Sequence, residues 1–257
     1  MAHLQGKVIA VTGAGSGIGR ATALECAARG AKLALSDINQ SSLNETVEKV
    51  RARGVEVIGT VVDVSKSASV DDWTAETMKH FGRLDGAANV AGVEGKPGGS
   101  VFNNIVDITD DHWDFVQHVN VTGLFYCVRA QLRVMERGAS ILNVASMAGL
   151  MGRPGIAAYS TSKHAAIGLT RTAAKEVGER GIRVNAIAPG PVATPMLDRI
   201  RMDGGTEERA VTNTYKNVPL QRLGSPEEMA KTICFALGDD ASWTTGAVFS
   251  VDGGIAC

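Results

Sequence analysis

Residues 7–30 of the 257-residue chain read KVIAVTGAGSGIGRATALECAARG. The apolar run from Lys7 to Val11 is typical of a buried strand, and the glycine-rich segment Gly13–Gly19 marks a turn. A helical pattern then continues until Gly30 ends it. Glycines let backbone N–H groups approach a pyrophosphate, and a helix N-terminus adds partial positive charge. The stretch therefore predicts a nucleotide-binding strand, turn and helix.

The glycine spacing is not the strict GxGxxG pattern, because Ile18 stands where the third glycine would be. The spacing is instead GxxxGxG, formed by Gly13, Gly17 and Gly19, with Ser16 in the same turn. A tight turn without a ligand is the alternative interpretation. A run of four glycines in seven residues favours ligand binding over that alternative.

Asp37 follows the next predicted strand, Lys32–Ser36, about 20 residues after the glycines. An acidic residue at this place can hydrogen-bond the adenosine ribose hydroxyls of a dinucleotide, and it would repel a 2′-phosphate. Neither Ser16 nor Ile38 offers a positive charge to hold that phosphate. Asp37 therefore favours NAD(H) over NADP(H). The alternative role for Asp37 is to cap the helix that follows.

Strand and helix patterns alternate along the whole chain, without a linker, repeat or low-complexity segment. This order predicts an α/β fold: one Rossmann-like, doubly wound parallel sheet of about seven strands with helices on both faces. We expect residues 1–257 to form a single domain, with a substrate lid at about 191–222. The expected strands are 7–11, 32–36, 55–64, 84–92, 139–145, 182–188 and 245–251, and the expected helices include 41–53, 67–80, 109–137 and 157–179. A further helix is expected to begin at Ser225, which is followed by proline and two glutamates.

The segment from Ser146 to Lys163, SMAGLMGRPGIAAYSTSK, follows the strand-like run ILNVA. Tyr159 and Lys163 are four residues apart, so on a helix they share one face. An ammonium about 4 Å from the phenol, at an effective dielectric of about 20, would favour the phenolate by roughly 4 kcal/mol. That corresponds to about three pKa units, which would bring the phenol near neutrality as an acid/base. A generic surface pair is the alternative.

Other polar residues are expected at the same edge of the sheet, because Asp37, Asp63, Asn89 and Ser146 all follow predicted strands. In open α/β sheets, ligands bind at the carboxyl ends of the strands. Asn120 lies inside a predicted helix, where asparagine is unfavourable and needs a reason.

The composition excludes several classes of protein. The chain is 44% hydrophobic and 21% charged with a formal net charge of -1, and no basic run suggests nucleic acid binding. No apolar run reaches the ~18 residues of a membrane span, and the N-terminus lacks the apolar core of a signal peptide. Four scattered cysteines, without metal-ligand spacing, suggest free thiols, no metal site and a cytoplasmic location.

With these residues placed, the chain resembles the short-chain dehydrogenase/reductase superfamily along essentially its full length. The resemblance rests on TGAGSGIG at 12–19, Asp37, Asp63–Val64, NVAG at 89–92, Asn120, Ser146, YSTSK at 159–163, PG at 189–190 and VDGG at 251–254. One departure from the family pattern is Val90 in the segment NVAG, where the family commonly has a different residue.

The resemblance implies a catalytic set of Asn120, Ser146, Tyr159 and Lys163. Tyr159 would be the acid/base, Ser146 would orient the substrate oxygen, Lys163 would lower the pKa of Tyr159 and bind the nicotinamide ribose, and Asn120 would hold a water linked to Lys163. The expected cofactor-binding residues are Gly13, Ser16, Gly17, Ile18, Gly19, Asp37, Asp63, Val64, Asn89, Ala91, Gly92, Tyr159, Lys163, Pro189, Gly190, Val192 and Thr194. The resemblance also implies a homotetramer.

The expected activity is NAD(H)-dependent interconversion of a secondary alcohol and a ketone. Apolar residues after Ser146 and in the lid predict a mid-sized, largely apolar substrate, such as a terpenoid, steroid-like or polyketide intermediate. These residues are Met147, Leu150, Met151, Met196, Leu197, Ile200 and Met202. Arg153 or Arg199 could instead meet an anionic substrate. An NADPH-dependent ketoreductase, or a non-redox protein on the same fold, is the alternative function.

Overall fold

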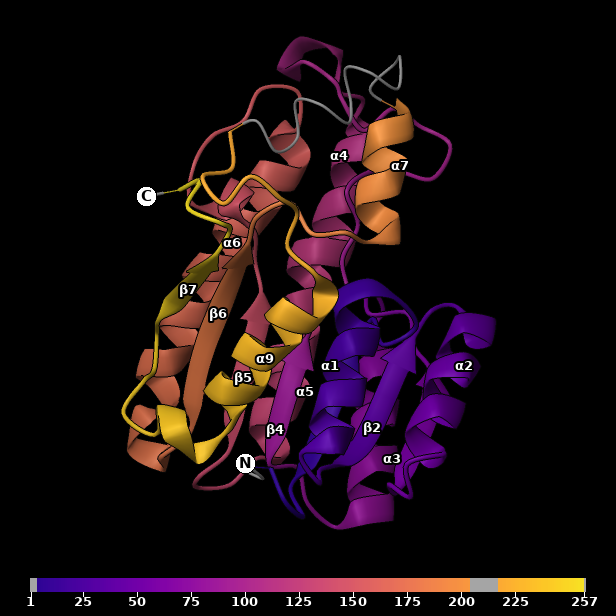
Figure 1. Ribbon diagram of the computed structural model, residues 1–257, viewed down its shortest axis with the longest axis vertical. Helices are drawn as coiled ribbons and strands as arrows, with labels where there is room; N and C mark the ends of the chain where they lie inside the picture. Colours follow the sequence, from indigo (N-terminus) through magenta and orange to yellow (C-terminus); the bar gives the residue numbers. More distant parts are fainter. Residues whose placement is uncertain (1–3, 204–216, 257) are drawn as a thin grey trace.

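A seven-stranded parallel sheet, in the order β3-β2-β1-β4-β5-β6-β7, organises the chain (Figure 1). We describe it from a computed structural model, in which residues 4–203 and 217–256 are described. The strands are β1 (Val8–Thr12), β2 (Lys32–Asp37), β3 (Val57–Val61), β4 (Gly86–Asn89), β5 (Ser140–Val144), β6 (Arg183–Pro189) and β7 (Val248–Val251). The strand order changes direction between β1 and β4, which is where open α/β sheets bind ligands.

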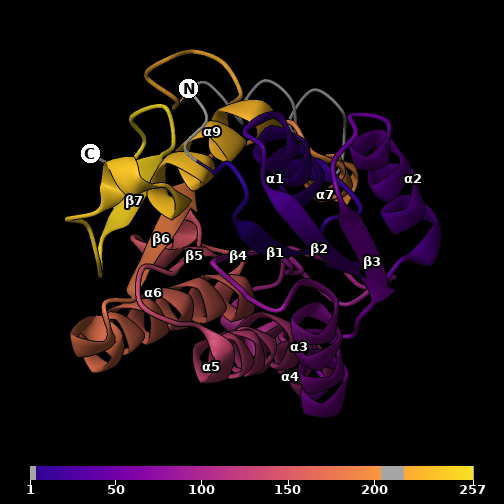
Figure 2. The ribbon, with the colours of Figure 1, turned by 90° about the horizontal axis from the view of Figure 1, so that it is seen from below.

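Helices cover both faces of the sheet, as Figure 2 shows. One face carries α1 (Gly17–Ala28), α2 (Gln40–Arg51) and α9 (Pro226–Leu237), and the other carries α3 (Ser67–Phe81), α4 (Asp110–Gln117), α5 (Gly123–Val134) and α6 (Ala157–Val177). The predicted α/β fold with about seven strands is thereby confirmed. The side chains of β1 alternate between the layers: Ile9 and Val11 pack with α1 and α9, whereas Val8 and Ala10 pack with α5 and α6.

The long helix predicted from Thr109 to about Arg137 is interrupted and shorter. It consists of α4, a π-helical turn at His118–Thr122, and α5, which ends at Val134 because Met135 has extended backbone angles. The strands predicted at 55–64 and 245–251 are likewise shorter, as β3 and β7. The residues next to these strands still bond to the neighbouring strand, since the Val62 N–H donates to the Asp37 carbonyl and the Gly246 N–H donates to the Val184 carbonyl.

The predicted start of α9 is confirmed in atomic detail. The hydroxyl of Ser225 accepts a hydrogen bond from the Glu228 backbone N–H, and the Glu228 carboxylate accepts one from the Ser225 backbone. This capping box, with Pro226 in the first turn, satisfies backbone donors that the helix itself leaves unpaired.

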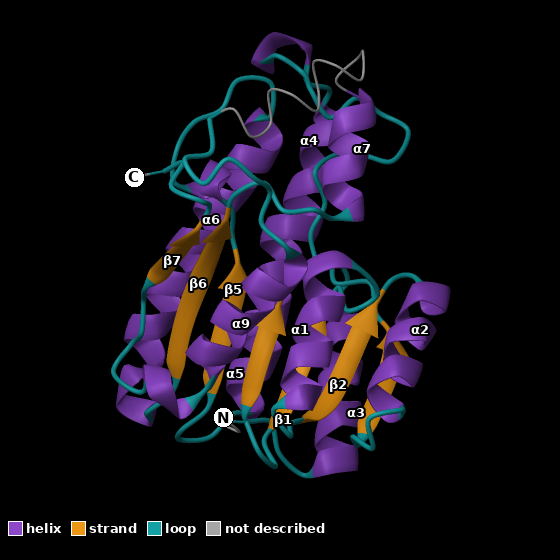
Figure 3. Cartoon of the chain, viewed as in Figure 1, coloured by secondary structure: helices purple, strands orange, loops and turns teal. Residues whose placement is uncertain are grey.

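The loops that follow the strands gather beyond the carboxyl edge of the sheet, together with α4 and α7 (Pro195–Asp203), as Figure 3 shows. The predicted lid at about 191–222 begins with α7, and its residues 204–216 lie outside the described part of the chain. Among the described helices, none has both the length and the apolarity that crossing a membrane requires.

Candidate active site

The glycine turn is packed so closely that side chains would not fit. A Cβ atom on Gly19 would lie 2.0 Å from the carbonyl oxygen of Gly13, and one on Gly13 would lie 2.9 Å from the backbone of Ala91. Gly13 also has a φ of +66°, which other residues adopt at a cost. Ser16 precedes α1 without capping it through its side chain. The N-terminus of α1 therefore presents backbone N–H groups to an anion.

Asp37 reaches this turn from the end of β2. Its carboxylate accepts hydrogen bonds from the backbone N–H of Gly15 at 2.8 Å and of Asn39 at 2.9 Å. The alternative that Asp37 caps the following helix is wrong, because Asn39 caps α2 by accepting from the Ser42 N–H. The carboxylate of Asp37 thus lies beside the glycine turn, where an adenosine ribose would be bound.

Thr12 fastens the ends of β1 and β4 together at the same edge. Its hydroxyl accepts hydrogen bonds from the backbone N–H groups of Val90 and Ala91, at 3.0 and 3.1 Å. These bonds hold Ala91 against Gly13. We did not single out Thr12 from the sequence, although its place between a strand and the glycines was a usable signal.

The side chain of Asn89 does not face the cofactor edge. It is buried and exchanges hydrogen bonds with Gln131, and it donates to Asn143, whose amide donates in turn to Thr170. Asn89 therefore ties β4 to β5 and α5, and only its backbone is left for a cofactor. The sequence did not predict this network, because its members come from four elements.

The segment after β6 returns over the glycine turn. A methyl carbon of Thr194 lies 3.2 Å from where a Cβ on Gly17 would be, and Val192 pairs with Gly224 in an isolated bridge. Gly190, which follows the Pro189 end of β6, lies so close to Asp252 that a Cβ would approach its backbone to 2.7 Å. These contacts place Thr194 at the cofactor edge.

Asp63 follows β3, farther along the same edge. Its carboxylate accepts hydrogen bonds from the backbone N–H of Ser65 at 3.0 Å and from the Ser65 hydroxyl at 2.6 Å. Val64 packs against Gly123, where a Cβ would be 3.0 Å from a Val64 methyl carbon. Asp63 and Val64, which were predicted to bind the cofactor, thus both lie where β3 leaves the sheet.

Ser146, Tyr159 and Lys163 meet between β5 and the start of α6. Ser146, at the end of β5, forms a side-chain hydrogen bond with Tyr159. Lys163 is buried below them, with its ammonium 5.5 Å from the centre of the Tyr159 ring. That ammonium donates to the carbonyl oxygen of Val144 at 2.9 Å. The predicted proximity of the three residues is confirmed.

The predicted effect of Lys163 on Tyr159 is wrong for the protein alone. Burial raises the pKa of Tyr159 to about 12, the hydrogen bond with Ser146 lowers it, and the negative charge of Glu94 raises it further. Burial also lowers the pKa of Lys163 to about 8. Desolvation penalises the charged form of both groups, and the ammonium of Lys163 donates to the carbonyl oxygen of Val144.

Asn120 lies in the π-helical turn between α4 and α5, which supplies a reason for an asparagine inside a helix. Its amide pairs with the backbone of Val93, donating and accepting at 2.8 Å, and it also donates to the Ser162 hydroxyl. A Cβ on Gly92 would lie 3.1 Å from the Asn120 oxygen and 3.4 Å from the Lys163 nitrogen. Asn120 therefore fixes the chain after β4 close to Lys163.

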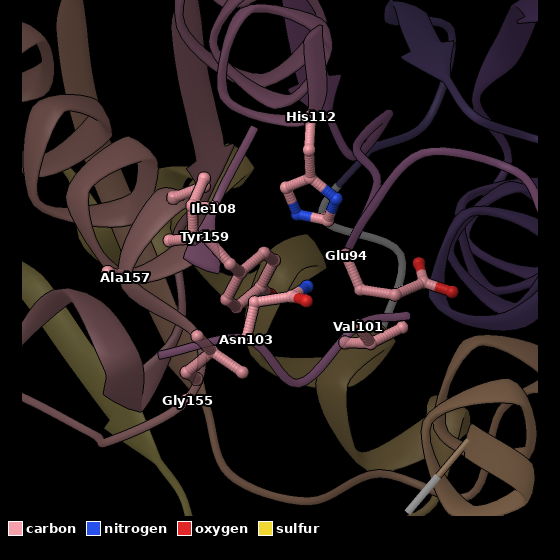
Figure 4. Close-up of a pocket in the computed structure, with 10 residues that line it drawn as sticks. Glu94, Val101, Asn103, Ile108, His112, Gly155, Ala157 and Tyr159 are labelled. Atoms are coloured by element: carbon pink, nitrogen blue, oxygen red, sulfur yellow. The ribbon is translucent and has the colours of Figure 1, made fainter. Parts of the chain in front are cut away.

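A narrow cleft that is open to solvent adjoins Tyr159, and we call it the Tyr159 cavity (Figure 4). Its lining residues are Glu94, Val101, Asn103, Ile108, His112, Gly155, Ile156, Ala157, Ala158 and Tyr159. Glu94, Asn103 and His112 are polar residues that the sequence analysis missed. They are 47 or more residues from Tyr159 in sequence and carry no motif, so only the folded chain brings them together.

The apolar residues predicted to form the substrate pocket do not line the Tyr159 cavity in the described part of the chain. Met147 is buried, whereas Leu150 and Met151 are exposed at 38% and 39%. The side chains of Ile200 and Met202 lie outside the described residues.

Arg199 on α7 is paired with Glu94 instead of being free for an anionic substrate. Its guanidinium donates to the Glu94 carboxylate at 2.7 and 3.3 Å. Glu94 is buried and Arg199 is largely exposed, so the pair fastens α7 to the segment after β4. Arg153, the other candidate for an anionic substrate, is exposed.

No three His, Cys, Asp or Glu side chains of the described residues lie together at metal-binding distance. The glycine turn, with its excluded Cβ positions, the free N–H groups of α1 and the carboxylate of Asp37 fit a dinucleotide instead. The nicotinamide end of that dinucleotide would lie toward Tyr159 and Lys163.

Comparisons with known proteins agree with this geometry. Residues 13–256 match the family model described as Enoyl-(Acyl carrier protein) reductase. The chain is 45% identical over 252 residues to the short-chain dehydrogenase/reductase aba4 of Botryotinia fuckeliana (strain B05.10), covering 98% of this chain and 97% of that protein. It is 39% identical to levodione reductase of Leifsonia aquatica, over 96% of this chain and 93% of that protein.

Solved structures show the same similarity. A crystal structure of levodione reductase superposes with a TM-score of 0.94 at 37% identity, covering 98% of both chains. A structure of NAD+-bound xylitol dehydrogenase superposes with a TM-score of 0.91 at 35% identity, covering 98% of this chain and 99% of that chain. The chain therefore belongs to the short-chain dehydrogenase/reductase family, and it is an oxidoreductase of alcohol and ketone groups that uses NAD(P).

Proposed function

We propose that the protein is an NAD(H)-dependent oxidoreductase that interconverts a secondary alcohol and a ketone. The observation that carries the proposal is the arrangement of Ser146, Tyr159 and Lys163 at the sheet edge where Asp37 meets the glycine turn. This arrangement combines an acid/base, Tyr159, beside the Tyr159 cavity with a carboxylate, Asp37, that can bind a ribose beside the glycine turn.

The bound cofactor supplies the hydride acceptor or donor, and the positive charge of its oxidised nicotinamide would favour the phenolate. In oxidation, Tyr159 takes the proton from the alcohol oxygen while Ser146 holds that oxygen in place by a hydrogen bond. In reduction, Tyr159 returns the proton to the oxygen of the former carbonyl. Lys163, fixed by the Val144 carbonyl, would bind the nicotinamide ribose and hold positive charge below the phenol. A water held by Asn120 would link Lys163 to solvent.

The carboxylate of Asp37 supports NAD(H) as the cofactor. An adenosine 2′-phosphate at this place would meet a negative charge, whereas ribose hydroxyls would donate hydrogen bonds to it. The alternative, an NADPH-dependent ketoreductase, would require Asp37 to leave Gly15 and a basic side chain to replace it.

The substrate in this proposal has a mid-sized, largely apolar skeleton, such as a terpenoid, steroid-like or polyketide intermediate. Support comes from the apolar side chains of Val101, Ile108 and Ile156 in the Tyr159 cavity. The relatives' names point to different substrates, levodione for one and xylitol for another, so they do not select among these classes.

The proposal includes a homotetramer in the cytoplasm. Support for the assembly comes from large apolar side chains exposed on two surfaces: Trp113 and Phe125 on α4 and α5, and Phe235 and Trp243 near β7. Light scattering of the purified protein tests this part of the proposal, and a monomer at micromolar concentration would contradict it.

The proposed function is tested by titrating the purified protein with NADH and NADPH and following nucleotide fluorescence. We expect NADH to bind at least about tenfold more tightly, a difference of about 1.4 kcal/mol. The Asp37→Ser variant should lose that preference, whereas Asp72→Ser, at an exposed position on α3, should keep it. Equal or tighter binding of NADPH by the wild type would contradict the assignment of Asp37 and favour the ketoreductase.

A further inference from the structure

His112 has an unusual environment among the histidines that the structure describes. It is 8% exposed, yet no described residue hydrogen-bonds either nitrogen of its ring. The other three described histidines have partners: His80 pairs with Glu56, and the rings of His118 and His164 bond to backbone carbonyls in the preceding turn. A ring nitrogen without a partner in the protein can hydrogen-bond a ligand.

The ring of His112 projects from α4 into the Tyr159 cavity. Its two nitrogens lie on the edge of the ring that faces Tyr159, Asn103 and Glu94 (Figure 4). The chain at Gly95 packs against the ring, since a Cβ there would be 3.1 Å from the ring carbon between the nitrogens. The imidazole is thus held in position opposite the acid/base.

Asn103 presents an acceptor to the same space. Its amide nitrogen donates to the Ser100 carbonyl at 2.7 Å, and its backbone N–H donates to the Gly155 carbonyl at 2.8 Å. The first bond fixes the side-chain amide and the second fixes the backbone, and the side chain lies beside the Tyr159 ring, below His112 in the view (Figure 4). The amide oxygen is not used by any hydrogen bond found among the described residues.

A neutral imidazole provides one N–H donor, and the amide oxygen of Asn103 provides an acceptor. A hydroxyl group is the ligand that satisfies both, since it accepts one hydrogen bond and donates another. We propose that His112 and Asn103 bind a hydroxyl group of the substrate, distinct from the oxygen on which Tyr159 acts. The substrate is then a diol in its reduced form and a hydroxyketone in its oxidised form.

The rest of the cavity agrees with a neutral second group. The carboxylate of Glu94 carries negative charge beside the cavity and already occupies Arg199, which disfavours a substrate carboxylate. Val101 and Ile108 cover the carbon skeleton between the two oxygens. The space between these side chains is narrow and open to solvent, so they would contact only one end of a mid-sized substrate.

This inference rests on the proposed function, because Tyr159 must act on the first oxygen. It is tested by the initial rates at which the enzyme reduces cyclohexanone, 3-hydroxycyclohexanone and 4-hydroxycyclohexanone with the nucleotide that it binds. We expect kcat/KM to be at least tenfold higher for one hydroxyketone than for cyclohexanone. A site built to hydrogen-bond a hydroxyl rejects the analogue that lacks it, because the polar groups of the site are left unpaired.

Variants assign the preference to its residues. His112→Phe and Asn103→Ala should each lower the ratio of kcat/KM for the hydroxyketone to kcat/KM for cyclohexanone about tenfold. The matched control is His118→Phe, at an exposed histidine whose ring bonds to Asp114, and it should change neither rate. An unchanged preference in His112→Phe and Asn103→Ala would overturn the inference.

Two further ketones test the chemistry of the group. 4-Methoxycyclohexanone accepts a hydrogen bond but cannot donate one to Asn103, so we expect it to react no faster than cyclohexanone. 4-Oxocyclohexanecarboxylate carries an anion, and its preference over both hydroxyketones would overturn the assignment of a hydroxyl.

A binding measurement separates failure of this inference from failure of the proposed function. In ¹⁵N-histidine-labelled wild-type enzyme saturated with nucleotide, a hydroxyketone should shift the imidazole signals of one of the five histidines, and cyclohexanone should not. A shift without turnover of any ketone would leave the hydroxyl site standing and contradict the proposed function. Turnover without such a shift would contradict the hydroxyl site alone. Because this measurement uses the wild-type enzyme, it decides the question even if His112→Phe fails to fold.

Discussion

The edge that faces the cofactor and the cavity that faces the substrate are built in different ways. The cofactor edge, from Gly13 to Asp37, consists mainly of backbone within one strand–turn–helix–strand unit. The Tyr159 cavity takes side chains from the segment after β4, from α4 and from the start of α6. The first has its chemistry encoded locally, whereas the second depends on where distant segments meet.

The two regions also differ in how much they reduce the stability of the folded protein. At the cofactor edge, hydrogen bonds such as Asp37 to Gly15 satisfy the polar groups that are present. At the catalytic side, Tyr159 and Lys163 have their pKa values shifted by burial, and His112 lacks a described partner. A functional site that keeps such groups gives up stability for chemistry. The following predictions test this contrast, beginning with the largest effect.

Replacing Tyr159 with Phe should break the catalytic side alone. We expect kcat to fall by about a thousandfold, because general acid/base catalysis typically contributes 10²–10⁴-fold. The dissociation constant of NADH, measured by fluorescence, should change less than threefold. Tyr126→Phe, at a tyrosine of α5 that stacks on Arg129, is the matched control with normal turnover. Retention of more than a tenth of the activity in Tyr159→Phe would contradict its role.

Replacing Gly19 with Ala should break the cofactor edge alone. The added Cβ would lie 2.0 Å from the Gly13 oxygen, so the turn must shift, and we expect NADH affinity to fall about a hundredfold. The control is Gly168→Ala on α6, where a Cβ meets nothing within 4 Å. That variant should bind NADH normally and be stabilised by about 1 kcal/mol, since alanine is the better helix former. Unchanged NADH affinity in Gly19→Ala would exclude the turn as the binding site.

Replacing Lys163 with Met should show how much the buried ammonium lowers the free energy of unfolding. The pKa of Lys163 is lowered by burial to about 8 in the folded protein, below its ordinary value of 10.5. Below pH 8 the lysine is charged in both states, and the folded state bears the full desolvation cost. That cost disappears as pH rises from 8 to 10.5, where the unfolded state binds more protons.

Lys163→Met should therefore lose activity but gain stability at pH 7. The shift of pKa corresponds to about 3 kcal/mol, and the Val144 carbonyl left without its donor reduces the gain to about 2 kcal/mol. Urea unfolding at pH 7 and pH 10 measures this gain, which should shrink at the higher pH. Lys175→Met, at an exposed position of the same helix, should be nearly neutral at both values. A destabilised Lys163→Met at pH 7 would show that the buried ammonium stabilises the fold.

The sequence predicted the parts whose information is local. Glycine spacing, apolar runs and helix signals such as Ser225 lie within a few residues of one another, and they gave the sequence of strands and helices along the chain and the cofactor edge. Ser146, Tyr159 and Lys163 could also be placed, because one short segment carries all three.

The pKa values of Tyr159 and Lys163 could not be predicted in the same way. The i, i+4 spacing gave their proximity, but the direction of each shift depends on burial and on Glu94, which is 65 residues earlier. The inward orientation of Asn89 likewise depends on Gln131 and Asn143, which belong to other elements.

The sequence by itself determined the fold, the family resemblance and the proximity of Tyr159 to Lys163, because backbone geometry and periodicity act over short stretches of chain. Tertiary structure alone decided that Glu94, Asn103 and His112 share a cavity with Tyr159. Burial and hydrogen-bond satisfaction are properties of the packed molecule, since each depends on all the segments that surround a side chain. For that reason, the sequence predicts the interconversion of an alcohol and a ketone, whereas our proposal for the kind of substrate rests on the folded structure.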